Sequence, residues 1–182
     1  MKNKFLKAWG VLLLFFTIVL TISFLLNPHF PQLVIVGESS VGTWISGALL
    51  IISGSFCLIT GMREGYIWFL ITAFFFGLAM DERFMFHEQL KERLIFTFRL
   101  SRSLFWIYEL PVILAALGGG FVAYLLWTKL NGISRIFLLC AVIFGTSSVV
   151  FDVFALGVLW EECFKLLAEV LISGALLKKV AS

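Results

Sequence analysis

The chain is poor in the charged residues that cover soluble proteins. Of its 182 residues only 14% are charged, whereas 61% are hydrophobic, and the mean hydropathy is +1.05. A typical soluble domain carries about 25% charged residues, so a hydrated surface cannot enclose this chain. The composition predicts an integral membrane protein.

Histidine and cysteine are also scarce, which narrows the possible metal and redox chemistry. The two histidines, His29 and His87, cannot form a three-histidine zinc centre of the kind used by alkaline-ceramidase-like membrane hydrolases. The three cysteines, Cys57, Cys140 and Cys163, lie in apolar segments without the spacing of metal ligands or a redox pair. No nucleotide-binding loop, nucleophile elbow or disulfide framework is present.

Long apolar segments account for nearly the whole chain. A helix needs about 20 apolar residues to cross the hydrocarbon layer. Six segments approach or exceed that length, at 6–26, 42–62, 66–88, 104–127, 134–153 and 155–177. We therefore predict an all-α integral membrane protein, in which residues 1–182 form a single transmembrane domain, a compact bundle of about six helices.

Basic residues cluster at the ends of these segments, so the net charge of +3 does not indicate a nucleic-acid-binding face. In a bundle with an even number of spans, most of them fall on one side of the membrane. Because an excess of Lys and Arg marks cytoplasmic loops, we predict cytoplasmic N- and C-termini and a multi-pass protein of the inner or plasma membrane. The residues are Lys2, Lys4, Lys7, Arg63, Lys129, Arg135, Lys178 and Lys179.

Segment 89–103 departs from this charge pattern. Its basic residues, including Lys91 and Arg93, fall on the predicted outer side. We interpret the segment as amphipathic and interfacial, with residues such as Leu94 and Phe96 toward lipid and the cations toward headgroups. The alternative is that the number of spans differs by one.

Two acidic doublets interrupt apolar segments. Asp81-Glu82 occurs in GLAMDERFMFHE, and Glu161-Glu162 occurs in GVLWEECFKLLAE. A charged side chain at the bilayer centre costs about 2.5–3.5 kcal/mol on insertion scales, so ionisable residues inside a span indicate function. These doublets are therefore the strongest functional signal in the sequence.

Helical geometry predicts which of these groups share a face. Each residue of a regular helix advances by about 100°, which places Asp81 and Glu88 on one face and Arg83 and His87 on another. In the last segment Glu161, Glu162, Lys165 and Glu169 fall within an arc of about 100° and form a polar stripe. With cytoplasmic termini, both groups converge on the outer half of the bundle, together with Glu109 and Asp152.

Crowded carboxylates need a metal ion, shared protons or cationic partners, and each solution implies a different function. The first is a metal-dependent, hydrolase-type enzyme acting on a lipid-like substrate at the outer leaflet. Its predicted ligands for a divalent metal ion of unspecified identity are Glu82, His87, Glu161 and Glu162. Asp81 or Glu88 would be the general base, and Arg83, Lys165 and Glu109 would bind substrate.

Two other functions fit the same residues. One is a proton- or ion-coupled transporter or channel, with the glycine run at 118–120 as a flexible element. The other is an ion-paired structural or partner-binding subunit, in which Arg83 and Lys165 neutralise Asp81 and Glu161. For each of these functions membrane lipid is the expected partner, and nucleic acid is not expected. The sequence is compatible with a homo-oligomer.

The segment Glu161-Glu162-Cys163-Phe164-Lys165 reads EExxK and resembles the first motif of the glutamic intramembrane endopeptidases. In that family the glutamates activate water for peptide hydrolysis. The match covers five residues, and no His, Asp or Asn follows Lys165 to supply the family's later motifs. The resemblance therefore illustrates what a glutamate pair can do, and the activity is not carried over.

Overall fold

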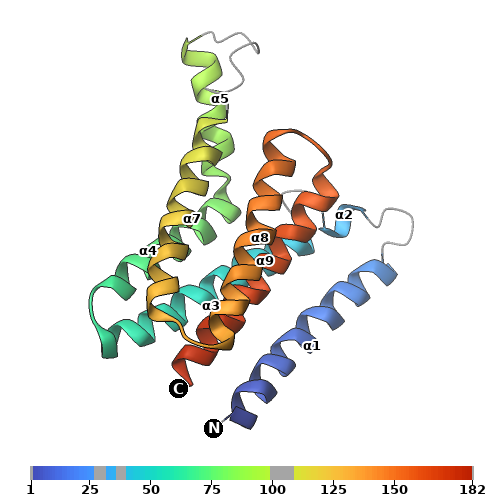
Figure 1. Ribbon diagram of the computed structural model, residues 1–182. Helices are drawn as coiled ribbons and strands as arrows, with labels where there is room; N and C mark the ends of the chain where they lie inside the picture. The colour runs from blue at the N-terminus through green and yellow to red at the C-terminus, as the bar shows by residue number, and fades with distance from the viewer. Residues whose placement is uncertain (1, 27–31, 36–39, 99–108, 182) are drawn as a thin grey trace.

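The computed structural model describes residues 2–26, 32–35, 40–98 and 109–181, and all regular structure in these ranges is α-helical (Figure 1). The helices are α1 (Lys2–Leu26), α2 (Gln32–Ile35), α3 (Val41–Glu64), α4 (Ile67–Phe84), α5 (Phe86–Phe98), α7 (Leu110–Lys129), α8 (Ile133–Val153) and α9 (Val158–Val180). The all-α prediction is confirmed for the described residues.

Among the described residues, four helices are long and apolar enough to cross a membrane, at Lys7–Leu26, Val41–Glu64, Leu110–Lys129 and Ile133–Val153. Helices α4 and α9 carry more charge. The last turn of α4 contains Asp81, Glu82 and Arg83, and the first half of α9 contains the predicted polar stripe. The structure thus agrees with a multi-pass membrane protein.

The predicted span 66–88 contains the end of one helix and the beginning of another. Helix α4 ends at Phe84, Met85 adopts a left-handed conformation (φ 52°, ψ 44°), and α5 begins at Phe86. A left-handed residue other than glycine costs about 1–2 kcal/mol, so neighbouring contacts must stabilise the break. Parts of the predicted segments 89–103 and 104–127 lie outside the described residues.

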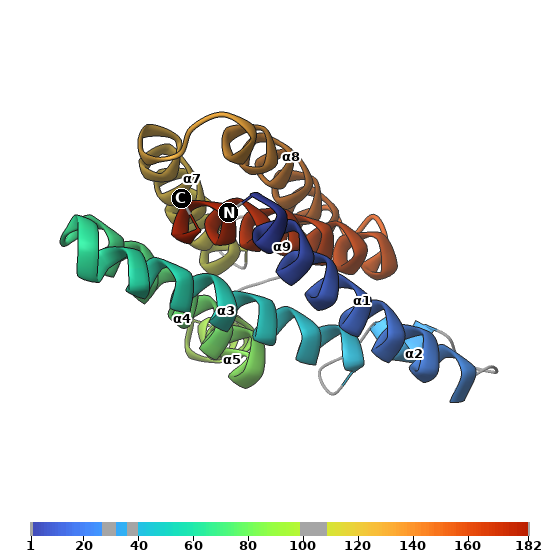
Figure 2. The ribbon, with the colours of Figure 1, turned by 90° about the horizontal axis from the view of Figure 1, so that it is seen from below.

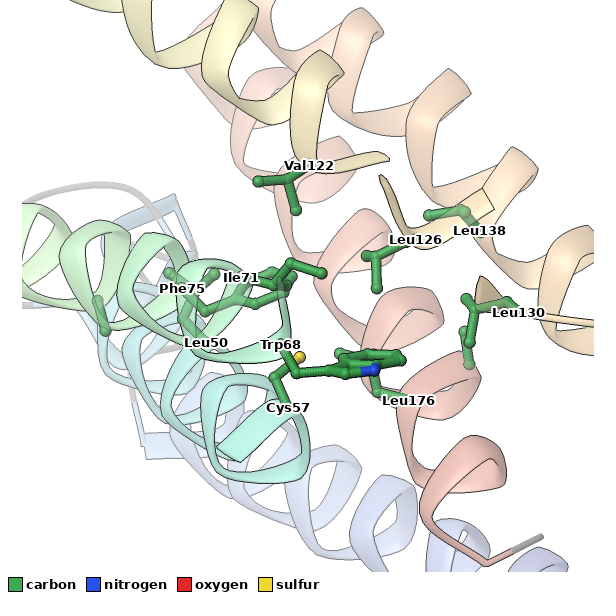
Figure 3. Packing of buried hydrophobic residues seen from close by; sticks show 12 residues of the cluster. Leu50, Cys57, Trp68, Ile71, Phe75, Val122, Leu126, Leu130, Leu138 and Leu176 are labelled. Atoms are coloured by element: carbon green, nitrogen blue, oxygen red, sulfur yellow. The ribbon is translucent and has the colours of Figure 1, made fainter. Parts of the chain in front are cut away.

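Helix α9 lies at the centre of the helix packing. It packs against α8 and α3, and α3 packs in turn against α4 (Figures 1 and 2). Figure 3 shows the main hydrophobic core, where Trp68, Leu126 and Leu176 meet from three different helices. The Trp68 ring is almost fully buried, and its Nε1 donates a hydrogen bond to Glu64 at 3.2 Å. This core fixes the helices that carry the charged groups.

Helix α1 lies beside α3 and α9 (Figure 2) and contacts α9 through a notch at Gly174. A Cβ atom added at Gly174 would lie 2.7 Å from Cε2 of Trp9. The Trp9 ring also packs against Phe137 of α8, with ring centroids 5.1 Å apart. Gly174 is therefore needed for the close approach of α1.

We expect Gly174→Ala to destabilise the protein by about 1–3 kcal/mol, because the added methyl group forces the Trp9 ring out of a packed position. Thermal unfolding in detergent measures the change. Gly77→Ala on α4 is the matched control, since nothing lies within 4 Å of its added Cβ. The control should hold or gain stability through better helix propensity. Equal stabilities of the two variants would contradict the proposed notch.

Candidate functional site

Lys165 is the centre of the buried charge. Its Nζ donates a hydrogen bond to Glu82 Oε1 at 2.9 Å and lies 2.7 Å from Glu162 Oε2. Glu82 comes from the last turn of α4, whereas Glu162 lies one turn before Lys165 on α9. The side chains of Lys165, Glu82 and Glu162 are 24%, 15% and 12% exposed, respectively. One ammonium group thus joins carboxylates from two helices.

Glu169 lies one turn further along α9 and is 8% exposed. Its Oε1 accepts a 2.8 Å hydrogen bond from Ser46 Oγ of α3, and its Oε2 has no hydrogen-bond partner among the described residues. Lys165 interacts with Glu169 electrostatically, but no described cation lies within 4 Å of it. Glu169 is therefore a buried acid held by a neutral hydroxyl.

Asp81 and His87 form a second pair, at the break between α4 and α5. His87 N donates to Asp81 Oδ1 at 2.8 Å, and His87 Nδ1 lies 2.8 Å from Asp81 Oδ2. Met85 N donates to the Asp81 carbonyl oxygen at 2.6 Å. The expectation that Asp81 and His87 occupy different faces is wrong, because it assumed a regular helix through Met85. Asp81 instead caps the first turn of α5.

Lys91 and Glu109 form a buried ion pair between α5 and the start of α7. Lys91 Nζ lies 2.8 Å from Glu109 Oε2, and both side chains are less than 10% exposed. Sequence reasoning assigned Lys91 to the lipid headgroups and Glu109 to substrate. Eighteen positions separate the two residues in the sequence, so no local spacing predicts their contact.

The remaining predicted site residues lie at the edge of this cluster. Glu161 interacts electrostatically with Asp152, Glu162, Lys165 and Lys91, yet no ion pair joins it to a described residue. Arg83 and Glu88 are exposed. The structure therefore gathers Glu82, Glu161, Glu162, Lys165 and Glu109 at one end of the bundle, whereas Arg83 and Glu88 face outward.

Three of the four predicted metal ligands, Glu82, Glu162 and His87, are engaged by other side chains. Lys165 lies between Glu82 and Glu162, and His87 is bound to Asp81. Within the described part of the chain, no three or more His, Cys, Asp or Glu side chains are grouped to hold a metal ion. The predicted site for a divalent metal ion stays a prediction that these contacts do not support.

Ser46 is a site residue that sequence reasoning missed. It contacts Glu169 across 123 positions, and nothing local to Ser46 indicates that partner. A weak signal does exist, because Ser46, Ser53 and Thr60 recur at intervals of seven on α3. Such a repeat marks one face of a helix.

The Lys165 contacts predict a strong and asymmetric effect on stability. Lys165→Met should destabilise the protein by about 3–5 kcal/mol, because it leaves the buried Glu162 and the largely buried Glu82 without their cation. Adding Glu82→Gln to that variant should recover part of the loss, since one of the carboxylates is then neutral. Thermal unfolding of both variants in the same detergent measures the difference. A double variant less stable than Lys165→Met would contradict the pairing.

The Asp81–His87 pair predicts a pH-dependent contribution to stability. Its hydrogen bond raises the pKa of the His87 imidazole, which lies in α5 outside the candidate spans. The pair therefore stabilises the fold fully below about pH 6.5, the usual histidine value, and less as pH rises through the raised pKa. The difference in melting temperature between wild type and His87→Gln should shrink from pH 5.5 to 9.

Asp81→Asn is the matched control for this titration. It keeps an oxygen to accept from His87 N but removes the charge that favours imidazolium. In the Asp81→Asn background, the difference in melting temperature caused by His87→Gln should depend less on pH. The same pH dependence in both backgrounds would show that another group is responsible.

Comparison with known proteins assigns most of the chain to one family. No curated protein and no solved structure matches the chain. One family model, described as Domain of unknown function (DUF8692), matches residues 9–179, which include helices α3 to α8, nearly all of α9 and every candidate site residue discussed above. The chain belongs to the DUF8692 family.

Proposed function

We propose that this protein moves protons, or ions coupled to protons, across the membrane. The observation that carries the proposal is Glu169, a carboxylate buried at the α3–α9 contact and held directly by the Ser46 hydroxyl. Ionisable groups inside spanning helices mark proton relays and ion pathways in pumps and transporters. Glu169 is placed like such a group, one turn from the Lys165 ion pairs.

Charge balance at the site supports this proposal. Glu82, Glu162 and Glu169 share one neighbouring ammonium group, that of Lys165. Carboxylates in a region of low dielectric need a compensating positive charge or a bound proton. Protons or other cations must therefore enter and leave whenever the charge on these groups changes.

We propose that six helices span the membrane: the four most apolar ones together with α4 and α9. Their 18 and 23 residues give lengths of roughly 27 and 35 Å, close to the hydrocarbon thickness of about 30 Å. The neighbours of α9, helices α3 and α8, are themselves long and apolar enough to span. The polar stripe of α9 can then face protein while its apolar side faces lipid.

The positions of the termini favour one orientation. Both lie at the same end of the bundle (Figure 1). Lys178 and Lys179 lie at that end in the last turn of α9, and Arg63 lies in the last turn of α3. By the distribution of basic residues, we propose that this end is cytoplasmic and that the Lys165 cluster lies toward the outer side.

The two other functions have less support from the contacts. Metal-dependent hydrolysis requires Glu82, Glu162 and His87 as ligands, and these three are paired with Lys165 or Asp81. A structural subunit was expected to have Asp81 and Glu161 neutralised by Arg83 and Lys165, whereas Lys165 pairs with Glu82 and Glu162 and Asp81 pairs with His87. A purely structural role also leaves the Glu169 carboxylate unexplained, since a neutral residue there would avoid its burial cost.

Proton movement can be tested in liposomes that contain the purified protein and the pH-sensitive dye pyranine. A potassium gradient with valinomycin makes the interior negative, and proton entry then acidifies it. We expect acidification faster than in protein-free liposomes, and at least tenfold slower entry with Glu169→Gln. The control is Glu92→Gln, a neutralised exposed glutamate on α5, which should retain the wild-type rate.

The same vesicles also test coupling to other cations. Outward gradients of sodium or potassium, applied without valinomycin, should change the internal pH if the protein exchanges these ions for protons. A folded wild-type protein that moves no protons under a potential or either gradient would overturn the proposal. It would leave the ion-paired structural role.

A further inference from the structure

Helix α3 carries three buried hydroxyl groups on a single face. Ser46, Ser53 and Thr60 are 0%, 0% and 4% exposed. Seven residues advance a helix by about 700°, nearly two full turns, and by roughly 10.5 Å along its axis. The three hydroxyls therefore form a row that runs along α3, with Ser46 of this row bound to Glu169.

This face of α3 is directed toward α9. Leu49, which lies about 60° from Ser46 around the helix, belongs to a buried cluster against which Leu166 and Val170 of α9 pack. The side with Gly54 contacts α4 instead, since a Cβ added there would lie 2.5 Å from the Phe76 ring. Ser53 lies within about 20° of Ser46 around the helix and thus on the α9 side.

Ser53 differs from the other serines and threonines of α3 in its hydrogen bonding. Thr60 donates to the Phe56 carbonyl oxygen at 2.8 Å, and Ser55 donates to the Ile51 carbonyl oxygen at 2.8 Å. Ser53 Oγ has no hydrogen-bond partner among the described residues, although it is fully buried. An unsatisfied buried hydroxyl costs about 1–3 kcal/mol, so Ser53 needs a polar partner such as a water molecule.

The row of hydroxyls leads to a second charged pair. Thr60 lies one turn before Glu64, at the end of α3. Glu64 Oε1 lies 2.7 Å from Lys179 Nζ of α9, and these groups are partly exposed. The α3–α9 contact therefore has an ionisable group at each end, Glu169 and Glu64, with hydroxyls between them.

We propose that the row formed by Ser46, Ser53 and Thr60 is a proton pathway from Glu169 to the Glu64–Lys179 end of the bundle. The inference rests on the proposed function and names the proton as the species that crosses this half of the protein. The row contains hydroxyls but no carboxylate between Glu169 and Glu64, whereas a metal ion that loses its water needs several oxygen ligands. Hydroxyls and water can relay protons by exchanging hydrogen bonds.

Each transfer conserves atoms and charge. The O–H bond of protonated Glu169 breaks as an O–H bond forms on a water or hydroxyl oxygen, which passes one of its own protons to the next oxygen. The Glu169 carboxylate is reprotonated from the side of the charged groups that interact with it, Glu82 of α4 and Glu162 and Lys165 of α9. The proton leaves the pathway to water near Glu64.

Two substitutions of similar size at Ser53 separate the effect of losing the hydroxyl from the effect of filling the space beside it. Ser53→Val fills the position without a hydroxyl, whereas Ser53→Thr fills it and retains one. In the pyranine assay we expect Ser53→Val to slow proton entry at least tenfold and Ser53→Thr to stay within about threefold of the wild-type rate. Ser55→Val, on the opposite side of α3, should match wild type.

The outcomes distinguish the pathway from the proposed function. If Ser53→Val and Ser53→Thr slow proton entry equally, or if neither does while Glu169→Gln abolishes it, the pathway is wrong and proton movement stands. If the wild type moves no protons, the proposed function fails, and the pathway fails with it. Thermal unfolding of each variant beside wild type identifies any that is slow because it is misfolded. Ser53→Ala, which removes the hydroxyl without adding bulk, then replaces Ser53→Val, and a rate within about threefold of wild type would overturn the role of the Ser53 hydroxyl.

Discussion

The contact on which the rest of this structure depends is the ammonium group of Lys165 between two carboxylates from different helices. A buried ion pair gains little net stability, because desolvation offsets most of its attraction. Its geometry, however, is strict, since losing either partner leaves an uncompensated charge. The contact with Glu82 therefore sets the rotation of α9 relative to α4, while the contact with Glu162, within α9, holds the Lys165 side chain in place. The Ser46–Glu169 hydrogen bond extends the same constraint to α3.

The rotation of α9 also accounts for which of its residues face outward. Trp160 and Leu167 lie on the side opposite Glu162 and Glu169, and they are 58% and 46% exposed. A helix with this division can cross a membrane despite its charged residues, provided that other helices cover its polar stripe. Small residues assist this packing, as Gly174 does by admitting the Trp9 ring of α1. Burial of the charged stripe of α9 thus depends on close helix packing, to which Gly174 contributes.

The sequence predicted the features that follow from hydropathy and helical period. It predicted helices with nearly the observed bounds for α3, α8 and α9, and it placed Glu162, Lys165 and Glu169 on one stripe. It did not predict the break at Met85, because DERFMFHE contains no Gly or Pro. The break depends on Asp81 capping the next helix, a contact that exists only in three dimensions. The partners of Ser46 and Lys91 likewise come from distant helices.

The position of Lys165 on α9 bears on how a proton could be exchanged there. Glu162 lies three residues before it and Glu169 four residues after it, and both spacings bring side chains together on a helix. The lysine stem has four flexible carbons, so the ammonium group can approach Glu169 without movement of the helix axis. Such a movement would lower the cost of a negative charge on Glu169 and raise that cost at Glu82 and Glu162. Proton release at Glu169 and proton uptake at Glu82 or Glu162 would then be coupled by one side chain. Directional transport requires such coupling.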